Sequence, residues 1–279
     1  MKLENFAKKI RYYTLRQLNS IGYGHYGGSL SIIETMAVLY GKYMNVNPSN
    51  PKSDERDYFI LSKGHAGPAY YATLAIKGFF PIEKLFTLNA NGTKLPSHPD
   101  RNYVEGVDMT TGSLGQGISV AAGAAYRLKY SDKPNRVYTI VGDGELNEGQ
   151  CWEAVQFIAH NNLNNLTIFV DDNKKQLDGY TEDICKTFDF VEKFKAFGLN
   201  SFKVNGNDVN EIDKTIQKAI DFKDTATVII LDTTKGQGVK LVEEIMDNHH
   251  IRLNDQQKVE LDDLVSKLEK ELEKEGMLP

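Results

Sequence analysis

Two polar turns, each following an apolar strand-like run, carry the clearest chemistry in this sequence. The run 137–141 leads directly into a Gly-Asp-Gly turn at 142–144, and the run 166–170 leads into an Asp-Asp-Asn turn that ends at Asn173. About one strand-helix-strand unit separates Asp143 from Asn173, so the two residues follow successive strands. Because ligands of open α/β sheets bind at the carboxyl ends of strands, we expect the two turns to meet at one site.

The oxygen atoms of these turns predict a divalent metal site. A carboxylate and an amide oxygen are hard ligands, which suit Mg²⁺ or Ca²⁺ and not Zn²⁺. Mg²⁺ usually combines a few protein oxygens with phosphate oxygens of a ligand. Gly142 and Gly144 have no Cβ and let the backbone approach such an anion. A Gly-Asp-Gly sequence alone is more often only a tight turn, and it is Asn173 that favours a metal site holding a diphosphate.

Three of the six histidines stand in loops marked by glycine or proline, namely His25, His65 and His98. His65 follows a strand-like segment, as Asp143 does, so its imidazole could donate a hydrogen bond to a diphosphate oxygen. A single histidine is more often a surface residue or a satisfied core residue. Three histidines in loops that could converge indicate a functional site.

The segment TTGSLGQGISVAAGAAYRL, which begins at Thr110, is rich in glycine and small residues. It contains G-x-x-G-x-G and lacks the G-x-G-x-x-G order of a dinucleotide-binding loop. A close approach of its backbone to a ligand or to a partner helix fits the composition better. The small residues at 121–125 indicate a tightly packed helix, which suits a subunit interface.

The elements that must position these residues follow from hydrophobic periodicity. We expect strands at 58–61, 137–141, 166–170, 201–204 and 226–231, and helices at 3–22, 30–44, 148–160, near 189–197, near 208–222 and about 255–275. The segment 87–117 contains turn signals and little periodicity, and a loop of that length is usually functional or disordered. Strands that alternate with helices predict an α/β fold: a parallel sheet with helices on both faces, built as one domain over 1–279.

The bulk composition excludes several classes of function. The 279 residues carry a net charge of −5, which gives no general attraction for nucleic acid or an anionic membrane. No stretch approaches the roughly 20 apolar residues of a membrane span, and the first residues do not resemble a cleaved signal. Cys151 and Cys185 stand alone without paired spacing, which predicts a reduced, cytoplasmic protein.

Several motifs, taken in order, resemble the transketolase family. GDGELNEGQCWEAVQFIAHNNLNNLTIFVDDN resembles the thiamine diphosphate motif, which opens with Gly-Asp-Gly and closes with an asparagine. GHYGGSLS, LSKGHAGPAYYATLA, LPSHPD, TTGSLGQGIS and DTTKGQGV with the later His-His pair are similar to the other blocks of this family. The resemblance extends from about residue 15 to 255 and covers the N-terminal half of a transketolase. It implies the diphosphate-binding domain of the thiamine-diphosphate-binding fold.

The resemblance implies roles for individual residues at the metal and the diphosphate. Asp143, Asn173 and the backbone carbonyl of Lys175 would bind Mg²⁺ or Ca²⁺. His65 and Gly144 would contact the diphosphate of thiamine diphosphate.

At the other end of the cofactor, the resemblance implies that Gly112 and Leu114 line the aminopyrimidine and that Leu177 packs near the thiazolium. It also implies that Glu148 belongs to a carboxylate network at the subunit interface.

The resemblance further implies that His25, His98 and one histidine of the His-His pair face the substrate. The block HHIRLND favours His250 over His249 for this role. Imidazoles titrate near neutral pH and could stabilise substrate oxygens or move protons. The implied reaction belongs to the pentose phosphate pathway and moves a two-carbon ketol unit from a ketose phosphate to an aldose phosphate.

The resemblance also implies partners. In this family two subunits enclose the cofactor: one contributes the diphosphate-binding domain, and the other contributes the pyrimidine-binding domain, which carries the glutamate that activates the aminopyrimidine. We therefore expect a split transketolase, in which this chain forms a homodimer within an α₂β₂ assembly with a separate C-terminal subunit. Two alternatives stay open: a subunit of another thiamine-diphosphate enzyme (deoxyxylulose-phosphate synthase-like or oxo-acid decarboxylating), and a non-catalytic remnant subunit.

Overall fold

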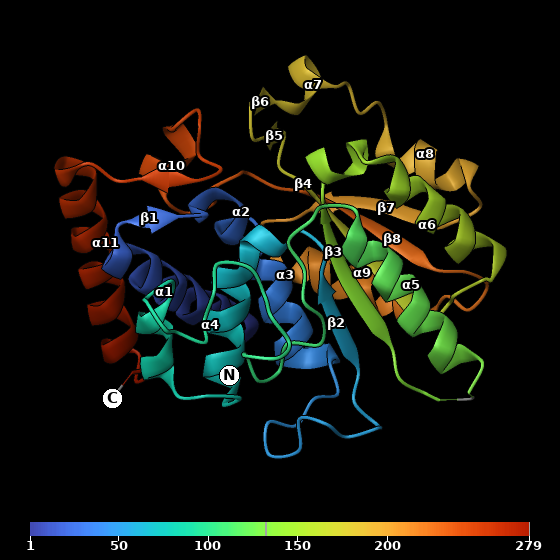
Figure 1. The fold of residues 1–279 in the computed structure, drawn as a ribbon, viewed down its shortest axis with the longest axis horizontal. Helices are drawn as coiled ribbons and strands as arrows, with labels where there is room; N and C mark the ends of the chain where they lie inside the picture. Colours follow the sequence, from blue (N-terminus) through green and yellow to red (C-terminus); the bar gives the residue numbers. More distant parts are fainter. Residues whose placement is uncertain (132, 279) are drawn as a thin grey trace.

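A five-stranded parallel sheet forms the centre of the molecule (Figure 1). A computed structural model of the protein describes residues 1–131 and 133–278. The strand order is β2-β3-β4-β8-β7, and every neighbouring pair is parallel. The strands are β2 (Tyr58–Leu61), β3 (Val137–Gly142), β4 (Leu166–Asp172), β7 (Asn200–Asn205) and β8 (Thr227–Asp232). The predicted α/β class is confirmed.

Helices cover both faces of this sheet and enclose two hydrophobic cores. One core lies under α1 (Leu3–Ile21), α3 (Ile33–Val38), α4 (Gly67–Lys77) and α9 (Val209–Asp221), and the other lies under α5 (Gln116–Lys129), α6 (Gly149–His160) and α8 (Phe190–Ala196). Successive residues of β3 alternate between the cores: Tyr138 and Ile140 face the first, and Val137 and Val141 face the second. Every residue of β3 and β4 is buried, as expected for central parallel strands.

The register brings three polar turns to the carboxyl edge of the sheet. Gly142 of β3 is paired with Asp171 of β4, and Asp172 is paired with Asp232 of β8. The segments that follow these strands therefore begin side by side. This is the edge at which open α/β sheets bind ligands.

Several short elements were not predicted because two to six residues produce no readable periodicity. They are β1 (Tyr23–Gly24), β5 (Lys175–Gln176), β6 (Gly179–Tyr180), β9 (Ile251–Arg252), α7 (Thr181–Ile184), α10 (Lys240–Glu244) and the 3₁₀ segments η2 (Gly64–Ala66), η3 (Ile82–Thr87) and η4 (Gly144–Asn147). One pair of them matters for the site. Strands β1 and β9 pair antiparallel, with Gly24 opposite Ile251, which joins the loop after β1 to the loop before β9.

The predicted continuous helix at 30–44 is wrong. The chain instead forms α2 (Tyr26–Leu30), α3 and a π-helical turn, η1 (Leu39–Tyr43). The break falls at Ser31 and Ile32, where the backbone of Ile32 leaves the helical region. There the hydroxyl of Ser31 donates to Asp171 at 2.6 Å, so a polar contact with the sheet edge interrupts the helical stripe.

The long loop predicted at 87–117 has no helix or strand between Leu88 and Gly115. It runs along the edge strand β2, because Asp108 accepts from the Phe59 amide at 2.7 Å and Thr111 donates to the Leu61 carbonyl at 2.7 Å. The two bonds hold the loop against β2, so that it extends from the amino end of this strand to the carboxyl edge of the sheet.

The C-terminal helix α11 (Asp255–Lys274) packs beside α1, as Figure 1 shows, and buries Leu261 and Leu272. Within 1–131 and 133–278, no helix combines the length and apolarity that crossing a bilayer requires.

Candidate cofactor site

Asp143 is a buried carboxylate at the end of β3, with 2% of its surface exposed. Its Oδ1 accepts from the Gly144 amide at 2.8 Å, and its Oδ2 accepts from the Lys174 amide at 2.8 Å and from Thr181 Oγ1 at 3.2 Å. Burial, followed by the negative charge of Asp171, raises the pKa of Asp143 to about 7. Of the ion pairs formed by the described residues, none includes Asp143. A cation would therefore be well placed against this carboxylate.

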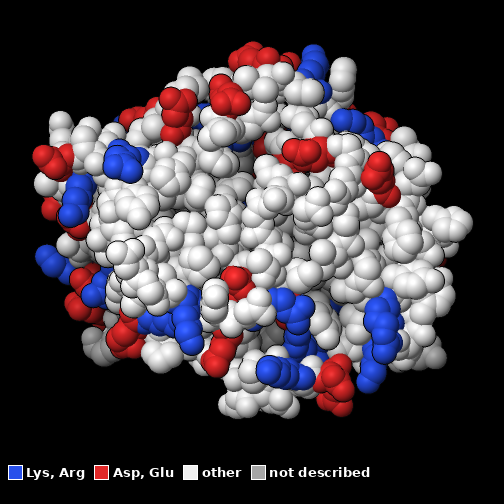
Figure 2. All heavy atoms as spheres, in the orientation of Figure 1, with Lys and Arg blue, Asp and Glu red and all other residues white. Residues whose placement is uncertain are grey.

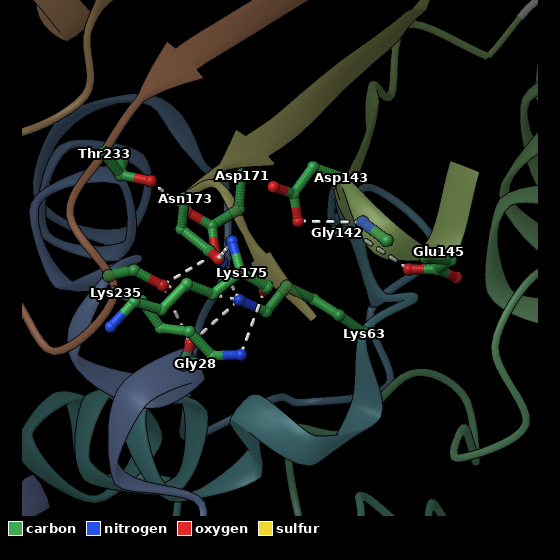
Figure 3. A network of polar contacts seen from close by, with 12 residues as sticks. Gly28, Lys63, Gly142, Asp143, Glu145, Asp171, Asn173, Lys175, Thr233 and Lys235 are labelled. Atoms are coloured by element: carbon green, nitrogen blue, oxygen red, sulfur yellow. Dashed lines mark hydrogen bonds and ion pairs between the residues drawn. The ribbon is translucent and has the colours of Figure 1, made fainter. Parts of the chain in front are cut away.

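Asp171, which is paired with Gly142 across the sheet, is the centre of a fully buried network (Figure 3). It accepts from Lys63 Nζ, Ser31 Oγ, Thr233 Oγ1 and Asn173 Nδ2. Burial alone would raise the pKa of Asp171, but the Lys63 ammonium holds it below its usual range. The network joins the ends of β2, β4 and β8 to the break after α2.

The Asn173 side chain is oriented by this network. Its Nδ2 donates to Asp171 at 2.7 Å, and its Oδ1 accepts from the Lys175 amide at 3.1 Å. These two bonds fix the orientation of the Asn173 amide: Oδ1 points toward the turn after β4, and Nδ2 points toward the buried Asp171. Together with the Asp143 carboxylate and the Lys175 carbonyl, Asn173 Oδ1 completes the predicted set of three hard oxygens, all from the turns after β3 and β4.

These oxygens suit Mg²⁺ or Ca²⁺ because both prefer carboxylate, amide and carbonyl ligands. Across residues 1–131 and 133–278, no group of three His, Cys, Asp or Glu side chains is arranged to hold a metal ion. The donor set here includes only one such side chain. The remaining ligands of a bound ion would have to be oxygens of another molecule.

Two buried lysines that sequence reasoning missed, Lys63 and Lys235, lie beside this set. Lys235, which follows β8 and is 3% exposed, donates from Nζ to the Lys175 carbonyl at 3.0 Å. Burial, followed by the positive charge of Lys63, lowers the pKa of Lys235 to about 8. Lysines are almost never buried without a partner. The available signal was their position, since each stands in the turn that follows a strand.

Five of the six histidines gather at the same edge. The ring of His25 lies 5.6 Å from His65, 5.3 Å from His98, 5.4 Å from His249 and 4.8 Å from His250, measured between centroids. The β1–β9 pair brings His25 to the His-His pair, and η2 brings His65. Burial, followed by its histidine neighbours, lowers the pKa of His25 to about 3.

Both members of the His-His pair flank His25, but they differ in their other neighbours. His249 lies 4.5 Å from the His65 ring, and its Nδ1 lies 3.4 Å from Lys235 Nζ. His250, the residue that the sequence favours, is exposed and lies 6.1 Å from the Tyr23 ring. His249 therefore joins the interior of the cluster, and His250 lies at its rim.

Of the residues expected around the cofactor rings, Gly112, Leu114 and Glu148 lie near one another, and Leu177 lies elsewhere. A Cβ on Gly112 would stand 3.6 Å from His98, so this glycine borders the histidine cluster. A Cβ on Gly115 would stand 3.1 Å from the Glu148 side chain, which places Glu148 against the segment that carries half-buried Leu114. Leu177 stands apart: it is 61% exposed in the turn between β5 and β6.

Glycines make close approaches possible at two points of the site. A Cβ on Gly28 would meet the His65 ring at 2.8 Å, and a Cβ on Gly144 would meet the Gln176 side chain at 2.8 Å. A side chain at either position would displace its neighbour. Gly144 thus lets the turn after β3 lie directly against Gln176 of β5.

The comparisons with known proteins agree with this geometry. Residues 3–267 match the family model described as transketolase, thiamine diphosphate binding domain. The chain is 45% identical over 254 residues to the 6-deoxy-6-sulfo-D-fructose transketolase subunit SqwG of Clostridium sp. (strain MSTE9), covering 91% of this chain and 92% of that protein. It is 39% identical over 250 residues to one subunit of the apulose-4-phosphate transketolase of Actinobacillus succinogenes, covering 89% and 90% of the two chains.

Among solved structures, the transketolase of Leishmania mexicana superposes with a TM-score of 0.87 at 28% identity, covering 95% of this chain and 41% of that chain. The chain thus spans nearly the whole length of the two curated subunits and less than half of the Leishmania enzyme. These relatives are named as transketolases, which are transferases, and the subunit names of the two curated proteins imply a partner subunit for each. The chain therefore belongs to the transketolase family, as the N-terminal, thiamine diphosphate-binding subunit of a split, two-chain transketolase.

Proposed function

We propose that this chain, as one diphosphate-binding domain over 1–279, binds thiamine diphosphate through Mg²⁺ or Ca²⁺ and works with a separate C-terminal subunit. The pair would transfer a two-carbon ketol unit from a ketose phosphate to an aldose phosphate. The observation that carries the proposal is the meeting of Asp143 and Asn173 with five histidines at one sheet edge. When bound, thiamine diphosphate supplies the carbanion chemistry that such a transfer requires.

We assign the metal to Asp143, Asn173 Oδ1 and the Lys175 carbonyl. Asp143 is buried without a protein cation, which supports its role as the charged ligand. Gly142, Gly144 and His65 would contact the diphosphate, with the Lys235 ammonium nearby as the counter-charge for its oxygens.

We assign the ring end of the cofactor to the segment with Gly112 and Leu114, with Leu177 covering it and Glu148 behind it. The closeness of Glu148 to Gly115, where an added Cβ would stand 3.1 Å from the Glu148 side chain, supports this grouping. Leu177 is 61% exposed, which supports a position that the cofactor or the second subunit covers on binding.

His25, His98 and His250 would face the substrate, and we add His249. The pKa values of His25 and His249 both fall to about 3, so these imidazoles are neutral near pH 7. A neutral imidazole has one N–H donor and one acceptor nitrogen. It can hold a substrate oxygen or take a proton from a substrate hydroxyl.

The assembly that we propose is a homodimer of this chain within an α₂β₂ complex. Tyr126 of α5, Tyr130 directly after α5 and Phe157 of α6 form an exposed aromatic cluster. The Tyr126 ring centroid lies 4.4 Å from that of Tyr130 and 5.5 Å from that of Phe157. On α5, Gly123 is exposed and has open space where a Cβ would stand. Figure 2 shows few charged groups over the centre of the face presented in Figure 1. Exposed aromatic side chains of this kind support a protein interface.

The donor sugar that we propose is a ketose phosphate. A second candidate is a ketose with a sulfonate, which the 45% identity to a 6-deoxy-6-sulfo-D-fructose transketolase subunit favours. Both groups are tetrahedral anions at one end of a sugar. We place the enzyme in the cytoplasm, which the unpaired cysteines Cys151 and Cys185 support.

The test is reconstitution of activity. This chain is mixed with the chain encoded next to it, with thiamine diphosphate and Mg²⁺, and ketol transfer to ribose 5-phosphate is measured. Xylulose 5-phosphate and 6-deoxy-6-sulfofructose are supplied as donors in parallel samples. Transfer only in the mixture supports the proposal, and the preferred donor decides between phosphate and sulfonate. Cofactor binding without transfer from either donor would contradict both sugar assignments, and no binding in any sample would favour a non-catalytic subunit.

A further inference from the structure

Glu145, the second residue of η4, is a buried carboxylate that the proposed function does not use. It is 2% exposed. Its Oε1 accepts from Ser62 Oγ and from the Gly115 amide at 2.9 Å, and its Oε2 accepts from the Gly142 amide at 3.0 Å. Figure 3 shows Glu145 turned toward Gly142, away from the Asp171 network. No ion pair formed by residues 1–131 and 133–278 includes Glu145.

The three donors come from three separate segments. Ser62 follows β2, Gly115 precedes α5, and Gly142 ends β3. A carboxylate buried without a cation is costly unless its oxygens are hydrogen-bonded. Here two of the three donors are backbone amides, whose positions the side chain therefore fixes.

The segment 112–117 belongs to no helix or strand until α5 begins at Gln116, so side chains hold its first part: Glu145 accepts from the Gly115 amide, and Gln150 Nε2 donates to the Gly115 carbonyl at 3.1 Å. Gly115 has φ +83°, a backbone conformation that favours glycine. Ser62 Oγ also accepts from the Ile118 amide at 3.0 Å. A Cβ on Gly117 would stand 2.5 Å from the Ser62 Cα, so the segment lies directly on the end of β2. Glu145 and Ser62 together hold it there.

We propose that Glu145 is a positioning residue that sets the separation between the two ends of the cofactor site. It holds the Gly-Asp-Gly turn at one oxygen and the segment 112–117 at the other. This inference rests on the proposed function, in which the turn receives the diphosphate and the segment lines the aminopyrimidine. A ligand that needs both ends gains affinity from the fixed separation, and a ligand that needs only the turn does not.

Comparing two ligands distinguishes a positioning role of Glu145 from a general effect on stability. Thiamine diphosphate reaches both ends, whereas inorganic diphosphate reaches only the turn. In Glu145→Gln, an amide group of similar size replaces one acceptor oxygen with a donor that faces a backbone N–H. One of the two ends must therefore lose its hydrogen bond to residue 145. The turn keeps its own bonds in either case, because the Asp143 amide donates to the Asp171 carbonyl and the Asp143 carboxylate accepts from the Gly144 and Lys174 amides.

The experiment measures the Kd of each ligand by calorimetry, with saturating Mg²⁺ and with the chain in complex with its partner subunit. We expect Glu145→Gln to weaken the binding of thiamine diphosphate at least ~10-fold and that of inorganic diphosphate less than ~3-fold. Hydrogen exchange at 112–117 should quicken. The control Glu260→Gln, an exposed residue of α11, should change neither Kd. Equal weakening of the two ligands, or no weakening of either, would overturn the inference.

Two further measurements keep the test decisive. Ser62→Ala removes one hydroxyl and leaves both backbone bonds to Glu145. If Glu145→Gln does not fold, Ser62→Ala should still raise the ratio of the thiamine diphosphate Kd to the diphosphate Kd, and an unchanged ratio overturns the inference. Failure of the unaltered complex to bind thiamine diphosphate would instead contradict the proposed function, whatever the variants do.

Discussion

The side-chain amide of Asn173 donates to the carboxylate of Asp171 at 2.7 Å, and the same carboxylate oxygen receives the Lys63 ammonium. A proposed metal ligand is thus oriented by an ion pair that is buried in the interior of the protein. Residues that orient the ligands of a metal commonly affect its affinity as much as they affect stability.

The first prediction concerns this pair. Asp171→Asn leaves the Lys63 ammonium buried without a counter-charge, so the free energy of unfolding should fall by about 3–5 kcal/mol. It also leaves only a neutral, weaker acceptor to orient Asn173, so Mg²⁺ affinity in the presence of thiamine diphosphate should fall about 10- to 100-fold. Urea unfolding and calorimetry measure the two effects.

The neighbouring Asp172→Asn is the control for this prediction, because Asp172 pairs with the half-exposed lysines Lys174 and Lys203. Equal effects at both positions would contradict the assigned role.

The second prediction tests the metal directly. Asp143→Ala should abolish Mg²⁺-dependent cofactor binding while the chain stays folded. Asp143 caps η4 through the Gly144 amide, and loss of such a cap costs about 1 kcal/mol. Circular dichroism reports the fold, and calorimetry with and without Mg²⁺ reports binding. Asp183→Ala, in α7 and exposed, is the matched control. Ordinary cofactor binding by Asp143→Ala would rule out the metal assignment.

The third prediction concerns the counter-charge for the diphosphate. Lys235→Met keeps the length of a buried side chain and removes its ammonium. Hydrogen bonds to charged groups contribute about 1.5–3 kcal/mol, so the Kd of inorganic diphosphate should rise roughly 10- to 100-fold at saturating Mg²⁺. Stability should not fall, because a buried charge is lost. Lys240→Met, on the exposed surface of α10, should leave the Kd unchanged. A diphosphate Kd that Lys235→Met does not alter would exclude Lys235 from the anion site.

The fourth prediction is a pH dependence of stability. The pKa of His25 is about 3 in the folded chain and about 6.5 when unfolded. The folded state therefore binds fewer protons between these values. His25 contributes its full stability above pH 6.5, and this contribution falls as the pH falls toward 3.

In His25→Asn, the difference in the number of bound protons between the folded and unfolded states should be smaller, because asparagine cannot take up this proton. Urea unfolding of both chains at about pH 7 and about pH 5 measures the difference. On going to the lower pH, the unaltered chain should lose more stability, by up to about 1.4 kcal/mol per pH unit. Identical losses would show that His25 is protonated as easily in the folded chain as in the unfolded chain.

The fifth prediction concerns the homodimer. Tyr126→Arg introduces a charge into the aromatic cluster of α5 and α6, so a dimer formed through this face should dissociate. Sedimentation of the chain with its partner subunit measures the change in mass. Tyr103→Arg alters a tyrosine that is also exposed but lies in the loop between η3 and α5, and it should not change the mass. Dissociation by both variants, or by neither, would place the interface elsewhere.

The sheet and part of the site could be predicted because their signals are local. Apolar runs mark β3 and β4, and polar residues directly after them mark Asp143 and Asn173. Glycine and proline mark the loops of His65 and His98. Each of these signals lies within a few residues of sequence, and the parallel fold then brings them to one edge.

The residues that sequence reasoning missed are those whose role is created by tertiary contacts. Lys63 and Lys235 are buried charges, and apart from their place after a strand nothing in the neighbouring sequence distinguishes a buried lysine from a solvated one. The choice between His249 and His250 depends on the pairing of β1 with β9, two strands too short to be predicted.

The most direct test of the central account is a calorimetric titration of thiamine diphosphate with Mg²⁺. It is performed on this chain alone, on its mixture with the partner subunit, and on the same mixture with a chelator. The account predicts binding in the mixture that the chelator abolishes, together with ketol transfer in that sample alone. Equal binding with and without the chelator would contradict the metal site at Asp143 and Asn173, and no binding to the mixture would contradict the cofactor site itself.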